Sequence, residues 1–165
     1  MIDFYSLVIY PILFILPAYV SNGAPVLFGG GRAIDAGKKI RGKRIFGDNK
    51  TVRGLIAGLL VGGLIAFGES MFLPYLLVIG IASSFGAHFG DLLGSFIKRR
   101  LGLSSGHNFM GMDQYFFVIF AIIFALPFGH APTIYGIIFI LIITGALHIF
   151  TNAIAHKWKL KSVPW

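Results

Sequence analysis

The sequence predicts an all-α integral membrane protein with five transmembrane helices. Hydrophobic residues make up 56% of its 165 residues and charged residues only 12%, with a mean hydropathy of +0.83, which lies outside the range of soluble domains. The fourteen Lys and Arg residues lie in three segments that long apolar stretches separate: Arg32–Arg53, Lys98–Arg100 and Lys157–Lys161. Because Lys and Arg accumulate in cytoplasmic loops, we expect these segments in the cytosol. Five spans then place the N-terminus outside and the C-terminus in the cytosol.

The first three apolar stretches predict one helix followed by a helical hairpin. A helix needs about 20 mostly apolar residues to cross a bilayer. The predicted spans are residues 4–20, 54–68 and 71–90. Pro11 and Pro17 in the first span are tolerated where neighbouring helices satisfy the freed carbonyl groups. A tight turn is expected between the second and third spans, at Glu69, Ser70 and Pro74.

The last two apolar stretches complete the domain. The predicted spans are residues 115–128 and 133–155, with a short turn at Gly129–Pro132 between them. Together the five spans form a single membrane domain over residues 1–165. Its two cytosolic loop regions are residues 21–53 and 91–114.

Glycines recur every four positions in the second span and around the end of the third. They are Gly54, Gly58 and Gly62, and then Gly86, Gly90 and Gly94. Small residues at this spacing let helix backbones approach closely. We therefore expect the two stripes to pack helices together, and they would also permit a homo-oligomer in which helices of two subunits pair.

The densest group of polar residues lies at the end of the third span. On a helix, the spacing of His88, Asp91, Ser95 and Lys98 places all four on one face. An ionisable residue at membrane depth is costly and indicates function, so Asp91 is the first candidate for a catalytic residue. The alternative is an ion pair between Asp91 and Lys98, or a neighbouring Arg, that only stabilises a helix interface.

A second acid, Asp113, lies just before the fourth span. Two carboxylates at one membrane face can hold Mg²⁺, which takes few protein oxygens and completes its shell with water and phosphate oxygens. Basic residues around Asp91 and Asp113 would neutralise phosphate charge, as phosphoryl or nucleotidyl transfer requires. Asp113 is alternatively the N-cap of the fourth span, since Asp is favoured just before a helix.

The first cytosolic loop carries eight of the basic residues. Its Gly37–Lys43 stretch imitates a P-loop, but Arg44 occupies the Ser/Thr position and no strand precedes it, so we do not assign a P-loop. We expect the loop to gather phosphates or lipid headgroups, or else to reflect membrane topology alone. Turns are predicted at Asn22-Gly23, Gly29–Gly31 and Gly47–Asn49. The alternative for Asn22 is a place in the wall of a polar cavity.

Composition limits which binding partners and which kinds of metal site we expect. The chain has no Cys, which excludes disulfides and thiolate metal sites. Its net charge of +8 indicates anionic lipid headgroups or phosphorylated substrates rather than nucleic acid. His148, Asn152 and His156 recur every four residues along the fifth span, with no third zinc ligand at a suitable spacing. We expect these three to hydrogen-bond across helices or to face the same cavity as Asp91.

Several motifs together resemble a known family. Gly90-Asp91-x-x-x-Ser95-x-x-Lys98-Arg99, with an Asp before the next span, resembles the signature of the membrane cytidylyltransferases that make CDP-diacylglycerol. The resemblance to the archaeal branch, the CDP-archaeol synthases, is closer and covers nearly the whole chain. Its motifs are Asn22-Gly23-Ala24-Pro25, Arg41–Thr51 with Arg53-Gly54, Gly94–Arg100, Asp113-Gln114, Thr151-Asn152 and the terminal Pro164-Trp165.

This resemblance implies a reaction, and the polar residues described above supply its candidate site. CTP would give CMP to an archaeal ether-lipid phosphate, unsaturated archaetidic acid, and release pyrophosphate in phospholipid biosynthesis. Mg²⁺ would be the cofactor, held by Asp91 and Asp113, with Lys98 as a further catalytic residue. The nucleotide and phosphates would be bound by Asn22, Lys43, Arg44, Lys50, Arg53, Ser95 and Arg99. The broader family continues as Asp-Arg-x-Asp where this chain has Asp113-Gln114-Tyr115-Phe116, which leaves open one metal ion or two.

Other functions remain as alternatives for a small polytopic membrane protein. A transporter or channel with a charged cytosolic vestibule would need polar groups near the bilayer midplane, whereas those of this chain gather at one face. A CDP-alcohol phosphotransferase would carry a dense array of Asp residues on one helix, which this sequence lacks. An anchor subunit would leave Asp91 and Asp113 with packing and capping roles alone. We expect the cytidylyltransferase, in the cell membrane with its active site facing the cytosol.

Overall fold

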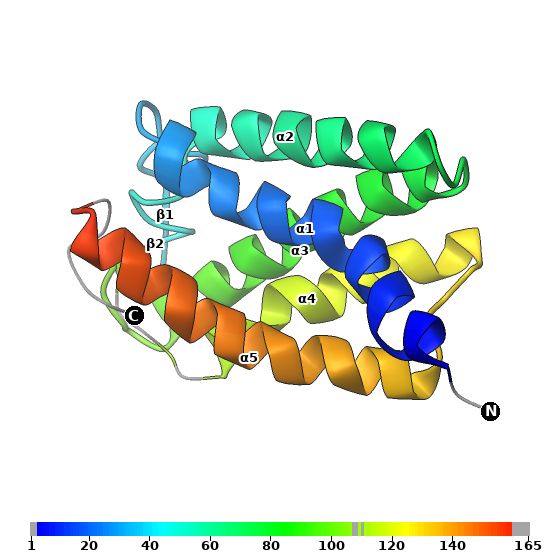
Figure 1. The fold of residues 1–165 in the computed structure, drawn as a ribbon. Coiled ribbons are helices and arrows are strands. Elements are labelled where there is room, and N and C mark those ends of the chain that lie inside the picture. Colours follow the sequence, from blue (N-terminus) through cyan, green and yellow to red (C-terminus); the bar gives the residue numbers. More distant parts are fainter. Residues whose placement is uncertain (1–2, 107–108, 110, 160–165) are drawn as a thin grey trace.

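The computed structural model describes residues 3–106, 109 and 111–159, and these form a bundle of helices (Figure 1). A π-helical turn, η1 (Tyr5–Ile9), leads into α1 (Tyr10–Phe28). The following loop contains a small antiparallel hairpin of β1 (Lys39–Ile40) and β2 (Lys43–Arg44). The remaining elements are α2 (Val52–Ser70), α3 (Leu76–Arg100), α4 (Met112–Ala125), the short 3₁₀ helix η2 (Leu126–Phe128) and α5 (Ile134–Lys157).

Four segments of the described chain are helices long and apolar enough to cross a membrane. They are η1 with α1, α2, α3 and α5. The helix α4 is also apolar but shorter, and η2 extends it to Phe128. The prediction of an all-α membrane protein is therefore confirmed. Even with η2, α4 is shorter than the length of about 20 residues that a bilayer core requires.

Two helices continue past the apolar stretches that predicted them. The helix α1 runs through Asn22 and Gly23, so the turn predicted there is wrong, and it ends at Gly29, whose amide donates to the Pro25 carbonyl. The helix α3 begins at Leu76 and continues to Arg100. Within its last ten residues, Asp91, Ser95 and Lys98 share one face of the helix. Asp91 therefore lies within a helix, where the sequence predicted the start of a loop.

Glycine contacts hold α2 and α3 against their neighbours. A Cβ atom at Gly58 of α2 would overlap the His88 ring of α3. At Gly90 of α3, it would overlap the Phe116 carbonyl of α4. The stripes thus pack helices within the chain, as predicted. The largest fully buried apolar side chains of this core are Phe14, Ile15, Leu76, Ile79, Val118 and Ile140.

The helix α5 is anchored to the bundle by its N-terminal part. Gly136 lies against Pro11 of α1, Ile140 is fully buried, and the Thr144 and Tyr19 hydroxyls are 2.7 Å apart. Beyond Thr144 the helix crosses toward the polar end of the bundle (Figure 1). This arrangement leaves its C-terminal part available to cover a cavity there.

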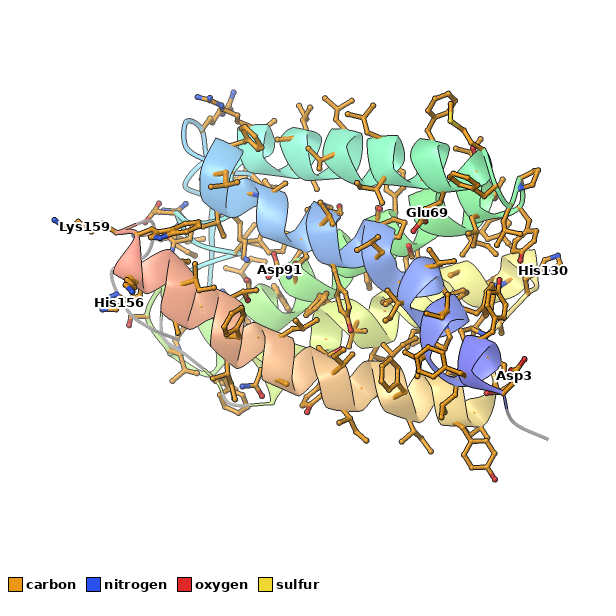
Figure 2. The ribbon with its side chains drawn as sticks, in the orientation of Figure 1. Asp3, Glu69, Asp91, His130, His156 and Lys159 are labelled. Carbon is orange, nitrogen blue, oxygen red and sulfur yellow. The ribbon has the colours of Figure 1, made fainter. Side chains whose placement is uncertain are left out.

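The described basic segments lie at one end of the bundle. Figure 2 shows His156 and Lys159 at this end, with Asp91 deeper inside, and Asp3 and His130 at the opposite end. The loop between α1 and α2 and the C-terminal end of α3 complete the basic end (Figure 1). The charge asymmetry predicted from the sequence is therefore a property of the folded chain. Lys161, Pro164 and Trp165 lie outside the described residues.

Candidate active site

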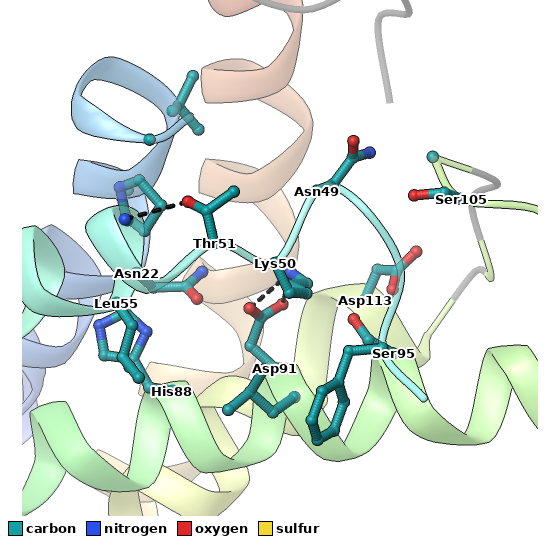
Figure 3. Close-up of a pocket in the computed structure, with 18 of the residues that line it drawn as sticks. Asn22, Asn49, Lys50, Thr51, Leu55, His88, Asp91, Ser95, Ser105 and Asp113 are labelled. Carbon is teal, nitrogen blue, oxygen red and sulfur yellow. Dashed lines mark hydrogen bonds and ion pairs between the residues drawn. The ribbon is translucent and has the colours of Figure 1, made fainter. Parts of the chain in front are cut away.

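A cavity of about 750 Å³ opens at the basic end of the bundle. Its walls come from the C-terminal turns of α1, the loop before α2, the middle of α3, the start of α4 and the last turns of α5. Figure 3 shows its polar side chains converging from these elements. Those that the sequence singled out are Asn22, Lys50, His88, Asp91, Ser95, Lys98, Arg99, Asp113, His148 and Asn152.

One face of α3 supplies the floor of the cavity. His88, Asp91, Ser95 and Lys98 all line it, which confirms that their helical spacing places them together. Both carboxylate oxygens of Asp91 accept from the Nζ of Lys50, each at 2.6 Å (Figure 3). Lys50 comes from the loop before α2, so this ion pair joins the loop to the helix.

A second ion pair lies on the same wall. The Nζ of Lys98 is 2.5 Å from one oxygen of Asp113, and the other oxygen accepts from the Phe109 amide at 2.9 Å. Asp113 lies in the first turn of α4, whose N-cap is Gly111. Its carboxylate therefore stabilises the helix start, as an acid in a first turn does, while also facing the cavity.

The remaining predicted site residues differ in their placement. Arg99 lines the cavity, is only 6% exposed and donates to the Ser104 carbonyl. Its Nε has no hydrogen-bond partner among the described residues. Lys43 and Arg44 line a neighbouring hollow of about 260 Å³ that shares Arg99 with the main cavity. Arg53 is exposed at the start of α2 and lines neither.

The last turns of α5 form the wall opposite α3. His148 and Asn152 line the cavity, and the side-chain amide nitrogen of Asn152 is 3.1 Å from the Nδ1 of His148. This answers the open question for these two residues in favour of the cavity. His156 is exposed and lies outside the lining.

Some lining residues were given no role by sequence reasoning. Thr51 lines the cavity beside Lys50, and its hydroxyl also caps α2 by accepting from the Gly54 amide at 3.1 Å. A Thr three residues before a helical Gly, at the start of an apolar run, is a capping signal. Ser105 and Trp158 also line the cavity, and nothing in their local sequence marks them.

The cavity offers carboxylate oxygens, the type of donor that Mg²⁺ prefers. No group of three or more His, Asp or Glu residues suited to a metal occurs among the described residues. Mg²⁺ nevertheless needs only one or two carboxylates when substrate phosphates and water supply the rest. Asp91 and Asp113 both face the cavity and keep part of their side chains exposed, 34% and 23%. Two such carboxylates are a suitable oxygen donor set.

Comparison with known proteins identifies the family of this chain. Residues 4–165 match the family model described as CarS-like: CDP-archaeol synthase. The chain belongs to this family. The CDP-archaeol synthase of Pyrococcus furiosus is 46% identical over 94% of this chain and 99% of the relative. That of Methanopyrus kandleri is 43% identical over 92% and 90%.

A solved structure supports the same assignment. It carries the description of an intramembrane enzyme for archaeal membrane lipid biosynthesis, with a TM-score of 0.81 and 33% identity. The match covers 86% of this chain and 91% of the other. As a member of the CDP-archaeol synthase family, the chain is an enzyme of the cytidylyltransferase class that acts on a lipid phosphate. This membership decides against a transporter, a channel or an anchor subunit.

Proposed function

We propose that this enzyme transfers CMP from CTP to the phosphate of unsaturated archaetidic acid, and that the reaction takes place in the cavity between α3 and α5. The observation that carries the proposal is the joining of two ion pairs, Lys50–Asp91 and Lys98–Asp113, in one cavity. Ionisable residues are costly at membrane depth, so charged pairs next to apolar spans indicate a function. The products would be CDP-unsaturated archaeol and pyrophosphate.

The chemistry requires charge neutralisation more than covalent catalysis. An oxygen of the lipid phosphate attacks the α-phosphorus of CTP, a new P–O bond forms, and the bond to the β-phosphate bridging oxygen breaks. Pyrophosphate leaves with the electron pair of that bond. Lys50, Lys98 and Arg99 are placed to hold the phosphates, because all three line the cavity and cations offset the repulsion between phosphates. Asn22 of α1 and Ser95 of α3 add neutral hydrogen-bonding groups to the cavity lining.

Asp91 and Asp113 would hold Mg²⁺ in this enzyme. When bound, the ion would neutralise phosphate charge and orient the reacting groups. Without substrates, Lys50 and Lys98 hold the two carboxylates. Each Lys can exchange a carboxylate for a phosphate, since both partners are anionic oxygens. The two ion pairs thus hold both carboxylates at the cavity.

The lipid chains need an apolar path to the polar floor. Apolar side chains of α1 and α5 line the same cavity, among them Val26, Leu27, Ile154 and Trp158. The lipid chains would lie along these apolar side chains while the headgroup reaches Asp91. The basic end would face the cytosol, where CTP is made and where Lys and Arg accumulate.

The direct test is release of pyrophosphate from CTP by the purified protein in detergent. The assay would contain Mg²⁺ and unsaturated archaetidic acid, with ATP, GTP, UTP and EDTA as controls. We expect metal-dependent turnover that prefers CTP and needs the lipid phosphate. Saturated archaetidic acid in a parallel assay would define the tail preference. Folded protein that turns over no nucleotide would refute the proposal.

A further inference from the structure

We propose that Asp35 is a positioning residue that fixes the loop segment Gly47–Thr51, and with it Lys50, over the cavity. This inference rests on the proposed function, because it concerns the residue that pairs with Asp91. In this proposal, Arg44 helps to hold the loop by pairing with Asp35. The sequence predicted a phosphate contact for Arg44 instead.

The Asp35 carboxylate accepts hydrogen bonds from several groups of the loop between α1 and α2. Its side chain is completely buried, although it lies in a loop among basic residues. One oxygen accepts from the Gly37 amide at 3.1 Å, and the other accepts from the Phe46 and Gly47 amides at 3.0 and 3.1 Å. The Arg44 guanidinium, and then these backbone amides, hold the pKa of Asp35 well below its usual range. A buried carboxylate with this many donors fixes the backbone around it.

The guanidinium of Arg44 pairs with two carboxylates of the same loop. Its Nε and one terminal nitrogen donate to the two oxygens of Asp35, at 3.2 and 2.5 Å. Its other terminal nitrogen donates to Asp48 at 2.5 Å. This is the two-point geometry that a guanidinium offers and an ammonium does not. Two carboxylates are thus partners of the Arg44 guanidinium, and Arg44 lines the neighbouring hollow rather than the main cavity.

The fixed backbone leads directly to Lys50. The Lys50 amide donates to the Gly47 carbonyl at 3.3 Å, and the Lys50 carbonyl accepts from the Ile34 amide at 2.8 Å. An isolated antiparallel β-bridge between Ala33 and Thr51 holds the C-terminal end of the segment. Both ends of Gly47–Thr51 are thus tied to the residues next to Asp35, and a change at Asp35 moves the backbone that carries the Lys50 side chain.

The same loop is also tied to the helix that carries the candidate catalytic residues. The Arg100 guanidinium, at the end of α3, donates to the carbonyls of Ile40, Lys43 and Arg44. The Lys43 ammonium donates in return to the Arg100 carbonyl at 3.2 Å. The hairpin therefore sets the loop at a fixed place relative to α3, and Asp35 sets Lys50 at a fixed place within the loop.

The test combines activity with a probe of loop mobility. Asp35→Asn removes the charge and one acceptor without changing the side-chain size. We expect CTP turnover to fall roughly 10- to 100-fold, since a misplacement of about 1 Å at a reacting centre can cost about 100-fold. The matched control is Lys39→Gln, which removes one charge from an exposed side chain of the same hairpin, and it should keep wild-type turnover. Thermal unfolding in detergent would show that both variants are folded.

Because the chain has no Cys, a single cysteine can carry a spin label without interference. The label would be placed by Asn49→Cys, next to Lys50, and by Ser70→Cys at the far end of α2 as a reference. Asp35→Asn should mobilise the label at position 49 and leave that at position 70 unchanged. Lower turnover with an immobile label at position 49, or a mobile label with normal turnover, would overturn the inference.

A second variant keeps the inference testable if Asp35→Asn does not fold. Arg44→Lys keeps the charge but loses the two-point contact, so it should loosen the label at position 49 and lower turnover by a smaller factor. Normal turnover and an immobile label in Arg44→Lys would also overturn the inference. If the wild-type protein shows no CTP turnover, the proposed function fails, while the label still reports on the loop.

Discussion

The two ends of the bundle are built from the same helices but differ in chemistry. At the basic end, polar side chains meet in a cavity of about 750 Å³. At the opposite end the helices close on one another. A Cβ atom at Gly80 would lie 2.8 Å from the Pro17 ring, the rings of Tyr75 and His130 stack at 4.0 Å, and the Tyr10 hydroxyl donates to the His130 carbonyl.

Because of this difference, substitutions at the two ends should have different effects. Close packing holds the helices together at the closed end, so substitutions there should change stability. At the open end, charged side chains gather around a cavity, and such an arrangement costs stability, as active sites commonly do. Substitutions there should change turnover while the fold persists. Each prediction below tests one side of this division.

The largest effect is expected for Asp91→Asn. Loss of the negative charge removes a magnesium ligand and the partner of Lys50, so turnover should be abolished. The Lys50–Asp91 pair is partly exposed, with 26% and 34% of the two side chains accessible, and such pairs contribute only about 0–1 kcal/mol to stability. Pyrophosphate release and thermal unfolding in detergent measure the two quantities. Wild-type turnover in this variant would remove Asp91 from the metal site.

A smaller loss of activity is expected for Lys98→Ala. The substitution removes a cation that faces the phosphates and leaves Asp113 with the Phe109 amide. We expect kcat/KM for CTP to fall about 10- to 100-fold, because a charge-assisted hydrogen bond is worth roughly 1.5–3 kcal/mol. A steady-state titration with CTP would measure it. If the protein unfolds while the affinity for CTP in the folded fraction is unchanged, Lys98 is a structural residue.

At the closed end, substitutions should lower the stability of the fold rather than change turnover directly. At Gly80, the β-carbon of Val would lie about 2.5 Å from the Ala66 Cβ, so Gly80→Val should destabilise the fold by about 1–3 kcal/mol through overpacking. The control is Gly68→Val at the same end, since nothing lies within 4 Å of a Cβ there. Thermal unfolding compares the two variants. Equal stability of the two would show that the closed end tolerates expansion, and that close packing does not define it.

The division between the ends also explains what the sequence could predict. The helices and the basic end follow from hydropathy and charge, which are local properties. The shared face of His88, Asp91, Ser95 and Lys98 follows from the helical period. The extension of α1 through Asn22 could not be predicted in this way, because polar residues at a span end are also typical of a loop.

The partners of the charged residues were beyond sequence reasoning. The pairing of Lys50 with Asp91, across 41 residues, depends on how a long loop folds back over α3. Arg44 and Arg53 stand in one basic run with Lys50, yet the first is engaged by Asp35 and the second is exposed. Charge alone does not distinguish such neighbours, since their roles depend on the contacts of the folded loop.

The smallest effect concerns Glu69, an acid at the closed end (Figure 2). Both of its carboxyl oxygens are buried, and neither has a hydrogen-bond partner among the described residues. This contrasts with Asp91 at the open end, whose two oxygens both accept from Lys50. A buried polar group without a partner costs about 1–3 kcal/mol, so an unbranched apolar side chain of similar length should be better tolerated at this position.

We therefore expect Glu69→Met to stabilise the fold by about 1 kcal/mol, which corresponds to roughly 2–4 °C in Tm for a chain of this size. Turnover should stay at the wild-type level, since Glu69 lies outside the cavity. Glu69→Gln is the matched comparison, because it keeps a polar group of the same shape and should gain less. A lower Tm for Glu69→Met, or a loss of turnover, would mean that the closed end holds a functional polar contact, and stability and activity would then not divide between the two ends of the bundle.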